Sequence, residues 1–204
     1  MTDITTRPTC TRCTRPQSHC LCAQIPCLPN QSQVLVLQHP DESKHPLNTA
    51  RLAVLGLQQA QLWIGERFEA LPALLERMEQ VCVLFPAKAH HVCQPLCAWD
   101  TSVPSLLIVP DGTWRQVRKI IHANPILERL PHLSLPLAEP SAYRVRRARE
   151  AAAVSTIEAI TRALQILEPE QNFSPLLKPF QTMVEQQIQA MGAEVYARNY
   201  QKNH

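Results

Sequence analysis

Glycine is scarce in this sequence, whereas proline is frequent. The 204 residues include only four glycines against 18 prolines. The glycines stand far apart, at positions 56, 65, 112 and 192, so the chain contains neither a Gly-x-Gly-x-x-Gly fingerprint nor a Walker A loop. A nucleotide-like ligand would therefore have to bind without a glycine-rich phosphate cradle, and a ligand that lacks phosphate would need none.

Long apolar segments and a strong net charge are also missing. No run of about 18 apolar residues occurs, and the first residues, MTDITTRPTC, lack the apolar centre of a secretory signal. We therefore expect a cytoplasmic protein with no membrane association and no obligate protein partner. The net charge of +3 does not by itself indicate a nucleic-acid-binding protein, so any basic surface must be local.

The apolar residues that are present, 45% of the chain, suffice for one core. Uniformly apolar segments at 33–39, 60–65, 81–86, 105–110 and 132–137 alternate with helix-like segments at 48–59, 70–80, 113–124, 153–167 and 175–191. Strands that are apolar throughout indicate a parallel sheet with helices on both faces, an α/β fold. Residues 1–30 show no periodicity, and we expect them to form a small unit in front of an α/β domain at 31–204.

The N-terminal segment carries a cysteine cluster with the spacing C-x2-C-x6-C-x-C. Its members are Cys10, Cys13, Cys20 and Cys22, and Cys27 or, less favourably, His19 could replace one of them. Four thiolates can surround one Zn²⁺ at about 2.3 Å, leaving no open coordination position, so the metal would be structural. Free cysteines in a flexible tail are the alternative. A dense cluster in a segment too short for its own core favours metal.

The stretch SLLIVPDGTWRQVRK, residues 105–119, places four residues between an expected strand and an expected helix. Parallel sheets bind ligands beyond the carboxyl ends of their strands, which is where Asp111 to Trp114 fall. The alternative is that Asp111 or Thr113 caps the helix while Trp114 packs on the core. Local sequence does not choose between the two.

Four motifs in order, CTRCTRPQSHCLC, HPDESKHPLNTARL, PDGTW and SAYRVRRAREAAAVSTIEA, resemble the DTW-domain family of tRNA-uridine aminocarboxypropyltransferases, a branch of the SPOUT superfamily. The resemblance covers residues 10–167 and implies a C-terminal trefoil knot. It implies transfer of the 3-amino-3-carboxypropyl group of S-adenosylmethionine to N3 of a tRNA uridine, with release of 5′-methylthioadenosine. We expect uridine 47, in the variable loop, as the target. S-adenosylmethionine has no phosphate, in agreement with the missing glycine loops.

Within this resemblance Asp111 is the candidate general base, which would take the proton from N3. The expected S-adenosylmethionine site comprises Leu84, Phe85, Pro86, Pro110, Asp111, Gly112, Thr113, Trp114, Ser155 and Thr156. Trp114 is a candidate for stacking on the donor or on the base, and equally for a core anchor. Ser155 and Thr156, with Arg144 or Arg147, could hold the carboxylate of the migrating group. A capping box of Ser155 with Glu158 is compatible with that role.

The expected tRNA surface is made of two basic clusters beside the site. Its residues are His39, Asn48, Arg115, Arg118, Lys119, Arg144, Arg146 and Arg147. Arg115, Arg118 and Lys119 have the spacing of one helix face. The alternative for each cluster is a solvated surface without a ligand.

Two other functions fit parts of the sequence. A non-enzymatic zinc-containing RNA-binding protein would need the cysteines and arginines alone. A SPOUT-type RNA methyltransferase would share the fold and the cofactor but release S-adenosylhomocysteine. The mass added to the RNA distinguishes all three.

Overall fold

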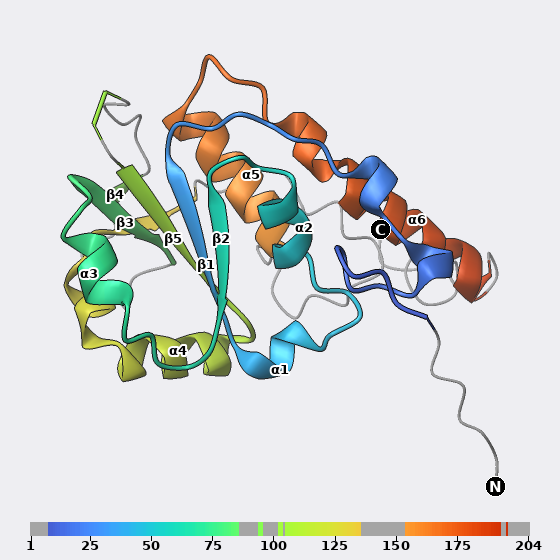
Figure 1. Ribbon diagram of the computed structural model, residues 1–204, viewed down its shortest axis with the longest axis horizontal. Helices are drawn as coiled ribbons and strands as arrows, with labels where there is room; N and C mark the ends of the chain where they lie inside the picture. The colour runs from blue at the N-terminus through green and yellow to red at the C-terminus, as the bar shows by residue number, and fades with distance from the viewer. Residues whose placement is uncertain are drawn as a thin grey trace, which may run out of the picture.

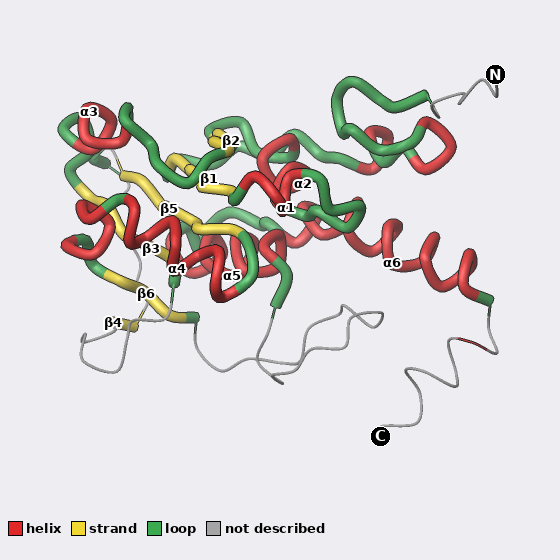
Figure 2. The backbone as a smooth tube through the Cα atoms, turned by 90° about the horizontal axis from the view of Figure 1, so that it is seen from below, coloured by secondary structure: helices red, strands yellow, loops and turns green. Residues whose placement is uncertain are grey.

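The computed structural model describes residues 8–85, 94–95, 102–103, 105–135, 154–192 and 195. Over these ranges six strands form one sheet in the order β2-β1-β5-β3-β6-β4 (Figure 2). Every neighbouring pair is parallel. The strands are β1 (Gln33–Gln38), β2 (Ala60–Ile64), β3 (Gln80–Leu84), β4 (Gln94–Pro95), β5 (Ser105–Asp111) and β6 (His132–Ser134). The predicted parallel α/β sheet is confirmed.

Helices cover both faces of this sheet (Figure 1). The α-helices are α1 (Pro40–Ser43), α2 (Ala50–Leu55), α3 (Leu71–Leu75), α4 (Trp114–Ala123), α5 (Thr156–Leu167) and α6 (Lys178–Met191). Short 3₁₀ helices are η1 (Gln17–His19), η2 (Cys22–Gln24), η3 (Pro125–Arg129) and η4 (Ser174–Leu177). No helix among these is long and apolar enough to cross a lipid bilayer.

Two apolar layers explain why the strands are apolar at every position. Val34 and Val36 of β1 point into the layer shared with α2, α5 and α6. Leu35 and Leu37 point into the opposite layer, shared with α3 and α4. Because successive side chains of a strand alternate between faces, both sets are buried only when both faces are covered.

The order of the strands places β1 beside β5 in the interior of the sheet. The chain runs from β1 to β2 on one side and then crosses to β3 on the far side of β5. Gln38 and Asp111, the last residues of β1 and β5, are partners in the parallel register. A crevice beyond the carboxyl ends of strands at such a reversal is the usual ligand site of an open α/β sheet.

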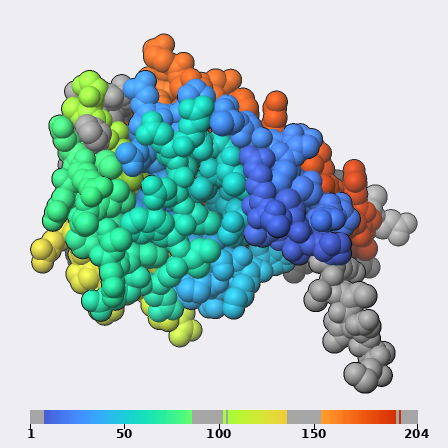
Figure 3. Space-filling model, viewed as in Figure 1, coloured from blue at the N-terminus to red at the C-terminus, as the bar shows by residue number. Residues whose placement is uncertain are grey.

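The N-terminal segment packs on the body of the protein and shares its core. Cys13, Leu21 and Ile25 are buried in the same apolar layer as α5 and α6, and η2 contacts α6. Figure 3 shows this segment, in dark blue, against the rest of the surface. Its apolar side chains are therefore buried by the α/β layer and not by a core of its own.

Several boundaries differ from those expected. The helix expected at 70–80 is confined to Leu71–Leu75, and the segment expected at 175–191 divides into η4 and α6. The strand β4 lies between the apolar segments expected at 81–86 and 105–110, where no strand was expected. The C-terminal trefoil knot stays a prediction, since residues 136–153 and much of the chain after 192 lie outside the described residues, as does Pro86.

Candidate active site

Asp111 ends β5 with its side chain almost fully buried, at 7% exposure. The Nε2 of Gln38 donates a hydrogen bond to its Oδ2 at 2.7 Å. The hydroxyl of Thr156, at the start of α5, donates to its Oδ1. An ionised carboxylate only accepts hydrogen bonds, so two donors stabilise the charged form, which is the form a general base needs.

Gly112 lets the chain turn directly after Asp111. Its φ is +149°, a value that residues with side chains rarely adopt. A Cβ at this position would lie 3.0 Å from Gln116 Oε1 and 3.4 Å from the Cβ of His39. The turn therefore requires glycine for both its backbone conformation and the close approach of its neighbours.

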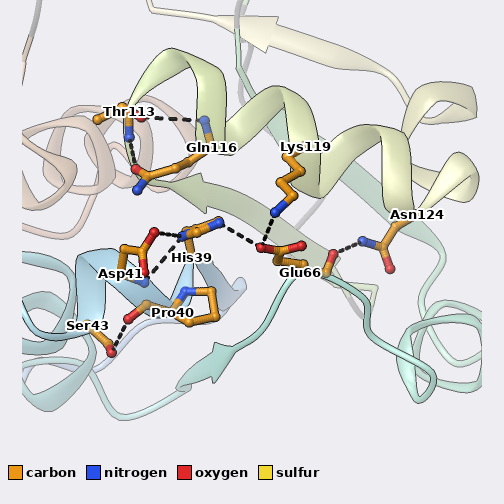
Figure 4. Close-up of polar contacts among 9 residues, drawn as sticks. All are labelled: His39, Pro40, Asp41, Ser43, Glu66, Thr113, Gln116, Lys119 and Asn124. Carbon is orange, nitrogen blue, oxygen red and sulfur yellow. Dashed lines mark hydrogen bonds and ion pairs between the residues drawn. The ribbon is translucent and has the colours of Figure 1, made fainter.

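Thr113, and not Asp111, caps α4. The Thr113 hydroxyl accepts from the N–H of Gln116, and Gln116 Oε1 accepts from the N–H of Thr113 at 2.7 Å, which completes a capping box (Figure 4). Of the two residues proposed as caps, Thr113 fills the role. The Asp111 carboxylate is thus directed to Gln38 and Thr156 and away from the start of the helix.

Trp114 is exposed, so its interpretation as a core anchor is wrong. Its side chain is 47% exposed. Its ring centroid lies 5.3 Å from that of Phe85, with the two planes tilted by 53°. Phe85 directly follows β3, and Leu84 before it is buried. The pair forms an accessible aromatic surface at the carboxyl edge of the sheet.

Ser155 and Thr156 have different partners. Glu158 accepts from the Ser155 N–H at 2.8 Å and from its hydroxyl at 2.7 Å. Both side chains are buried, so the capping-box interpretation of Ser155 and Glu158 holds. Thr156, the next residue, contacts Asp111 instead. The two residues expected to act as a pair are therefore divided between helix capping and the candidate base.

A charged network forms the rim between β1, β2 and α4 (Figure 4). His39 is 5% exposed; its Nε2 lies 3.0 Å from Glu66 Oε1, and its Nδ1 accepts from the N–H of Asp41 at 3.2 Å. The Lys119 ammonium lies 2.6 Å from the same Glu66 oxygen. Hydrogen bonding by Lys119, with a smaller contribution from His39, lowers the pKa of Glu66 below its ordinary value.

This network changes the expected RNA surface. His39 and Lys119, two of the expected contacts, have protein partners, and the His39 ring is not at the surface. Asn48 is half-buried and donates to Gln38 Oε1 at 3.2 Å. Arg115 and Arg118 are exposed on α4. Arg144, Arg146 and Arg147 lie outside the described residues.

Gln38 is the site residue that sequence reasoning missed. It stands at the end of an apolar strand, QVLVLQ, and is completely buried. A glutamine at the end of such a strand adds nothing to the apolar core. Burying its amide costs free energy unless both the oxygen and the nitrogen are hydrogen-bonded. A glutamine at the end of a buried apolar strand was therefore the sequence feature that could have identified this site residue. Its partner Asp111 is far away in sequence and was not deducible without the strand order.

The four cysteines of the N-terminal spacing come together. Their sulfur atoms all lie within 4.8 Å of one another, with 3.6 Å between Cys10 and Cys22 and 3.8 Å between Cys13 and Cys20. Four sulfurs at about 2.3 Å from one Zn²⁺ stand about 3.8 Å apart, so the arrangement fits tetrahedral zinc. Cys27 and His19 contact other residues, namely Gln58 and Ser18.

The thiols of this cluster differ in acidity. Backbone hydrogen bonds from Cys13 and Arg12 lower the pKa of Cys10 to about 6. Burial raises the pKa of Cys22 to about 12. Because the thiolate is the metal ligand, a metal ion would find Cys10 largely deprotonated at neutral pH and would displace a proton from Cys22.

Arg15 joins the cysteine segment to the loop before α2. Its Nη1 donates to the carbonyl oxygen of Pro46 at 2.7 Å, and its Nε donates to the carbonyl oxygen of His19 at 3.2 Å. The Pro46 loop leads into Asn48, which contacts Gln38. The cysteine segment thus lies against the same loop that reaches the candidate site.

Known proteins resemble this chain over most of its length. The DTW domain matches residues 7–188. The chain is 31% identical over 198 residues to tRNA-uridine aminocarboxypropyltransferase 2 of Macaca fascicularis, which covers 93% of this chain and 66% of the relative. The Drosophila melanogaster protein of the same name is 31% identical over 205 residues, covering 95% and 80%.

A plant relative is more distant. The tRNA-uridine aminocarboxypropyltransferase A of Arabidopsis thaliana is 24% identical over 209 residues, covering 80% of this chain and 74% of the relative. No solved structure gives a significant match. Since the DTW domain accounts for residues 7–188, and the candidate base, the aromatic pair and the cysteine cluster all lie within that range, the chain belongs to the DTW-domain family.

Proposed function

We propose that this chain is a tRNA-uridine aminocarboxypropyltransferase that uses S-adenosylmethionine as donor and acts on uridine N3. The observation that carries the proposal is the Asp111 carboxylate, held between Gln38 and Thr156 at the carboxyl ends of two central strands. The names of the animal and plant relatives support the reaction class. We expect the enzyme to act in the cytoplasm and to have a SPOUT-like fold with a C-terminal trefoil knot.

Asp111 acts on the proton of uridine N3. The carboxylate accepts this proton while N3 forms a bond to the methylene carbon attached to sulfur. The carbon–sulfur bond breaks, its electron pair goes to the sulfonium sulfur, and neutral 5′-methylthioadenosine leaves. Because the leaving group needs no protonation, most of the remaining acceleration must come from holding N3 and the carbon in line.

The aromatic pair supplies a place for a flat ring beside this carboxylate. Trp114 and Phe85 present ring surface to solvent at the sheet edge. Stacking of a base on such a surface contributes about 1–3 kcal/mol and tolerates any base. We assign this surface to the target uracil or to the adenine of the donor, with Leu84, Pro110, Gly112 and Thr113 forming the adjoining backbone.

Outside the reaction centre, two features complete the proposal. The four cysteines hold a zinc ion. This zinc is structural, because four protein sulfurs leave no coordination position for a substrate. Arg115 and Arg118, exposed on α4, contact tRNA phosphates. Arg144, Arg146 and Arg147 remain predicted contacts.

The test is product analysis with purified protein, S-adenosylmethionine and unmodified transcribed tRNA. We expect an aminocarboxypropyl group on uridine and 5′-methylthioadenosine in solution. A methyl group on the tRNA together with S-adenosylhomocysteine would identify a methyltransferase. Unchanged tRNA would favour the alternative of a non-enzymatic RNA-binding protein. A transcript with cytidine at position 47 tests the expected target.

Asp111→Asn tests the assigned base. The amide keeps the size of the side chain and can still accept from Gln38. We expect transfer to fall by about 10²–10⁴-fold, the usual contribution of a positioned general base, with tRNA affinity unchanged. Turnover retained in this variant would move the role of base to another residue.

A further inference from the structure

We propose that Gln38 and Asn48 are positioning residues that keep Asp111 ionised by fixing the direction of a buried hydrogen-bond chain. This inference rests on the proposed function, because it concerns the residue assigned there as base. Neither residue needs to touch a substrate. Their effect is exerted through the carboxylate of Asp111.

The direction of the chain is set by backbone groups that cannot change role. The N–H of Arg51 can only donate, and it donates to Asn48 Oδ1 at 3.3 Å. The Asn48 Nδ2 therefore points the other way, toward Gln38 Oε1 at 3.2 Å and the carbonyl oxygen of Glu42 at 3.4 Å. A carbonyl oxygen can only accept, so it anchors the same amide orientation from the second side.

The orientation of Asn48 determines that of Gln38. With Oε1 accepting from Asn48, the Nε2 of Gln38 faces Asp111 Oδ2 and donates at 2.7 Å. Gln38 is fully buried, so water cannot replace a broken link. Reversing either amide would set donor against donor and acceptor against acceptor. The chain thus presents Asp111 with an N–H and never with a lone pair.

The opposite oxygen of Asp111 is held differently. Thr156 contacts Oδ1 through a hydroxyl, which can donate or accept. That contact tolerates either protonation state of the carboxyl group, whereas the Gln38 amide favours the ionised one alone. On the β1 side of the site, the Gln38 amide is therefore the contact that suits only the ionised carboxylate.

Among the described residues, the charged groups on the elements around Asp111 either have other partners or are exposed. His39 follows β1 and binds Glu66, and Glu158 on α5 accepts from Ser155. Arg115, Arg118 and Lys119 lie on the exposed face of α4. These groups are the same in the wild type and in the variants below, so a difference in the pH–rate profile arises from the substituted side chain.

Two substitutions change the chain with little change in size. Gln38→Glu sets a second carboxyl group against Asp111 Oδ2, and two carboxyl groups at that distance share one proton. Asn48→Asp keeps the acceptor for Arg51 but removes the donor that orients Gln38. We expect the acid limb of the pH–rate profile to move up by about one pH unit or more in Gln38→Glu, and less in Asn48→Asp. Both should regain activity at alkaline pH.

Gln33→Glu is the matched control, because it makes the same chemical change at the other end of the same strand. Its pH–rate profile should equal that of the wild type. A loss of packing alone would lower activity at every pH without moving the profile. An unmoved acid limb in folded Gln38→Glu or in Asn48→Asp would overturn the inference.

A second readout does not depend on turnover. The chain has only four aspartates, at positions 3, 41, 100 and 111, so ¹³C-carboxyl labelling of aspartate gives a simple NMR titration, with the Asp111 signal assigned from Asp111→Asn. We expect the Asp111 midpoint to rise in Gln38→Glu and Asn48→Asp but not in Gln33→Glu. A shift without aminocarboxypropyl product would refute the proposed function alone. Product without a shift would refute this inference alone.

Discussion

Gly112 determines how the backbone leaves the candidate base. Its positive φ allows Asp111 to stay in the last position of β5 while Thr113, two residues later, caps α4. A residue with a side chain would have to change this turn or displace Gln116. The glycine thus connects the geometry of the base to the start of the helix.

Gly112→Ala should lower transfer more than it lowers stability. We expect a loss of about 1–3 kcal/mol in the free energy of unfolding, the usual cost of a side chain in a disfavoured backbone region. Transfer should fall further, because the displaced turn carries Asp111. Denaturant unfolding and initial rates measure the two effects.

Gly192→Ala is the control, since Gly192 also has a positive φ, +83°, but nothing lies within 4 Å of its Cβ position. Gly192→Ala should reduce the free energy of unfolding and leave the rate of transfer unchanged. Equal activity in Gly112→Ala and wild type would show that the turn does not hold the base.

Among the elements, the cysteine segment and α4 both lie next to the candidate site. The segment contacts the loop that leads to Asn48, and α4 begins just after Asp111. The segment is held to the body by its buried residues and by the Arg15 contact with Pro46. The helix α4 begins at Trp114, beside Asp111, and exposes its basic residues. We expect the cysteine segment to bind zinc and α4 to bind tRNA, and the two properties can be tested separately.

The purified protein should contain one zinc ion per chain. Cys20→Ser should lose it and unfold more easily, because a structural zinc site contributes directly to folding. Metal analysis and thermal unfolding provide the measurement. Cys27→Ser should keep the metal, since its sulfur lies outside the group of four. A zinc-free wild type that is folded and active would contradict the assignment.

Arg115→Glu combined with Arg118→Glu should weaken tRNA binding. If each arginine contacts one phosphate, the slope of log K against log salt should decrease by about one per residue removed. Binding measured at several salt concentrations gives this slope. The pair Arg77→Glu and Lys178→Glu makes the same change in net charge; Arg77 is exposed in the turn after α3, and Lys178 is exposed at the start of α6. An equal effect in both pairs would indicate general electrostatics and no specific face.

Over the whole molecule, the sequence predicted the layers better than the contacts. Uniformly apolar strands require two covered faces, so the parallel sheet followed from QVLVLQ and SLLIVP alone. The cysteine spacing likewise predicted its own cluster. Both predictions depend only on residues that are close together in the sequence.

Contacts between distant residues were beyond such patterns. The contact of His39 with Glu66 requires β2 beside β1, and the contact of Trp114 with Phe85 requires β3 beside β5. The helix α1 was missed because its four residues, PDES, contain no apolar period. Strand order decided the first two cases, and no single segment encodes it.

Glu168 links the two halves of the chain. At the end of α5 it accepts from the N–H groups of Gln31 and Ser32 at 3.0 and 2.8 Å, just before β1. Glu168→Gln turns an N–H₂ toward one of these donors and should cost about 1–3 kcal/mol in the free energy of unfolding. Denaturant titration measures it, with exposed Glu170→Gln as control. Equal stability of the two variants would contradict this role.

The burial of Cys13, Leu21 and Ile25 against α5 and α6 bears on how the protein is made. This segment leaves the ribosome before α6, which it needs to complete its packing. During translation its thiols and apolar side chains therefore stay accessible until α6 emerges from the exit tunnel. Early capture of a metal ion by these thiols would protect the nascent segment throughout that interval.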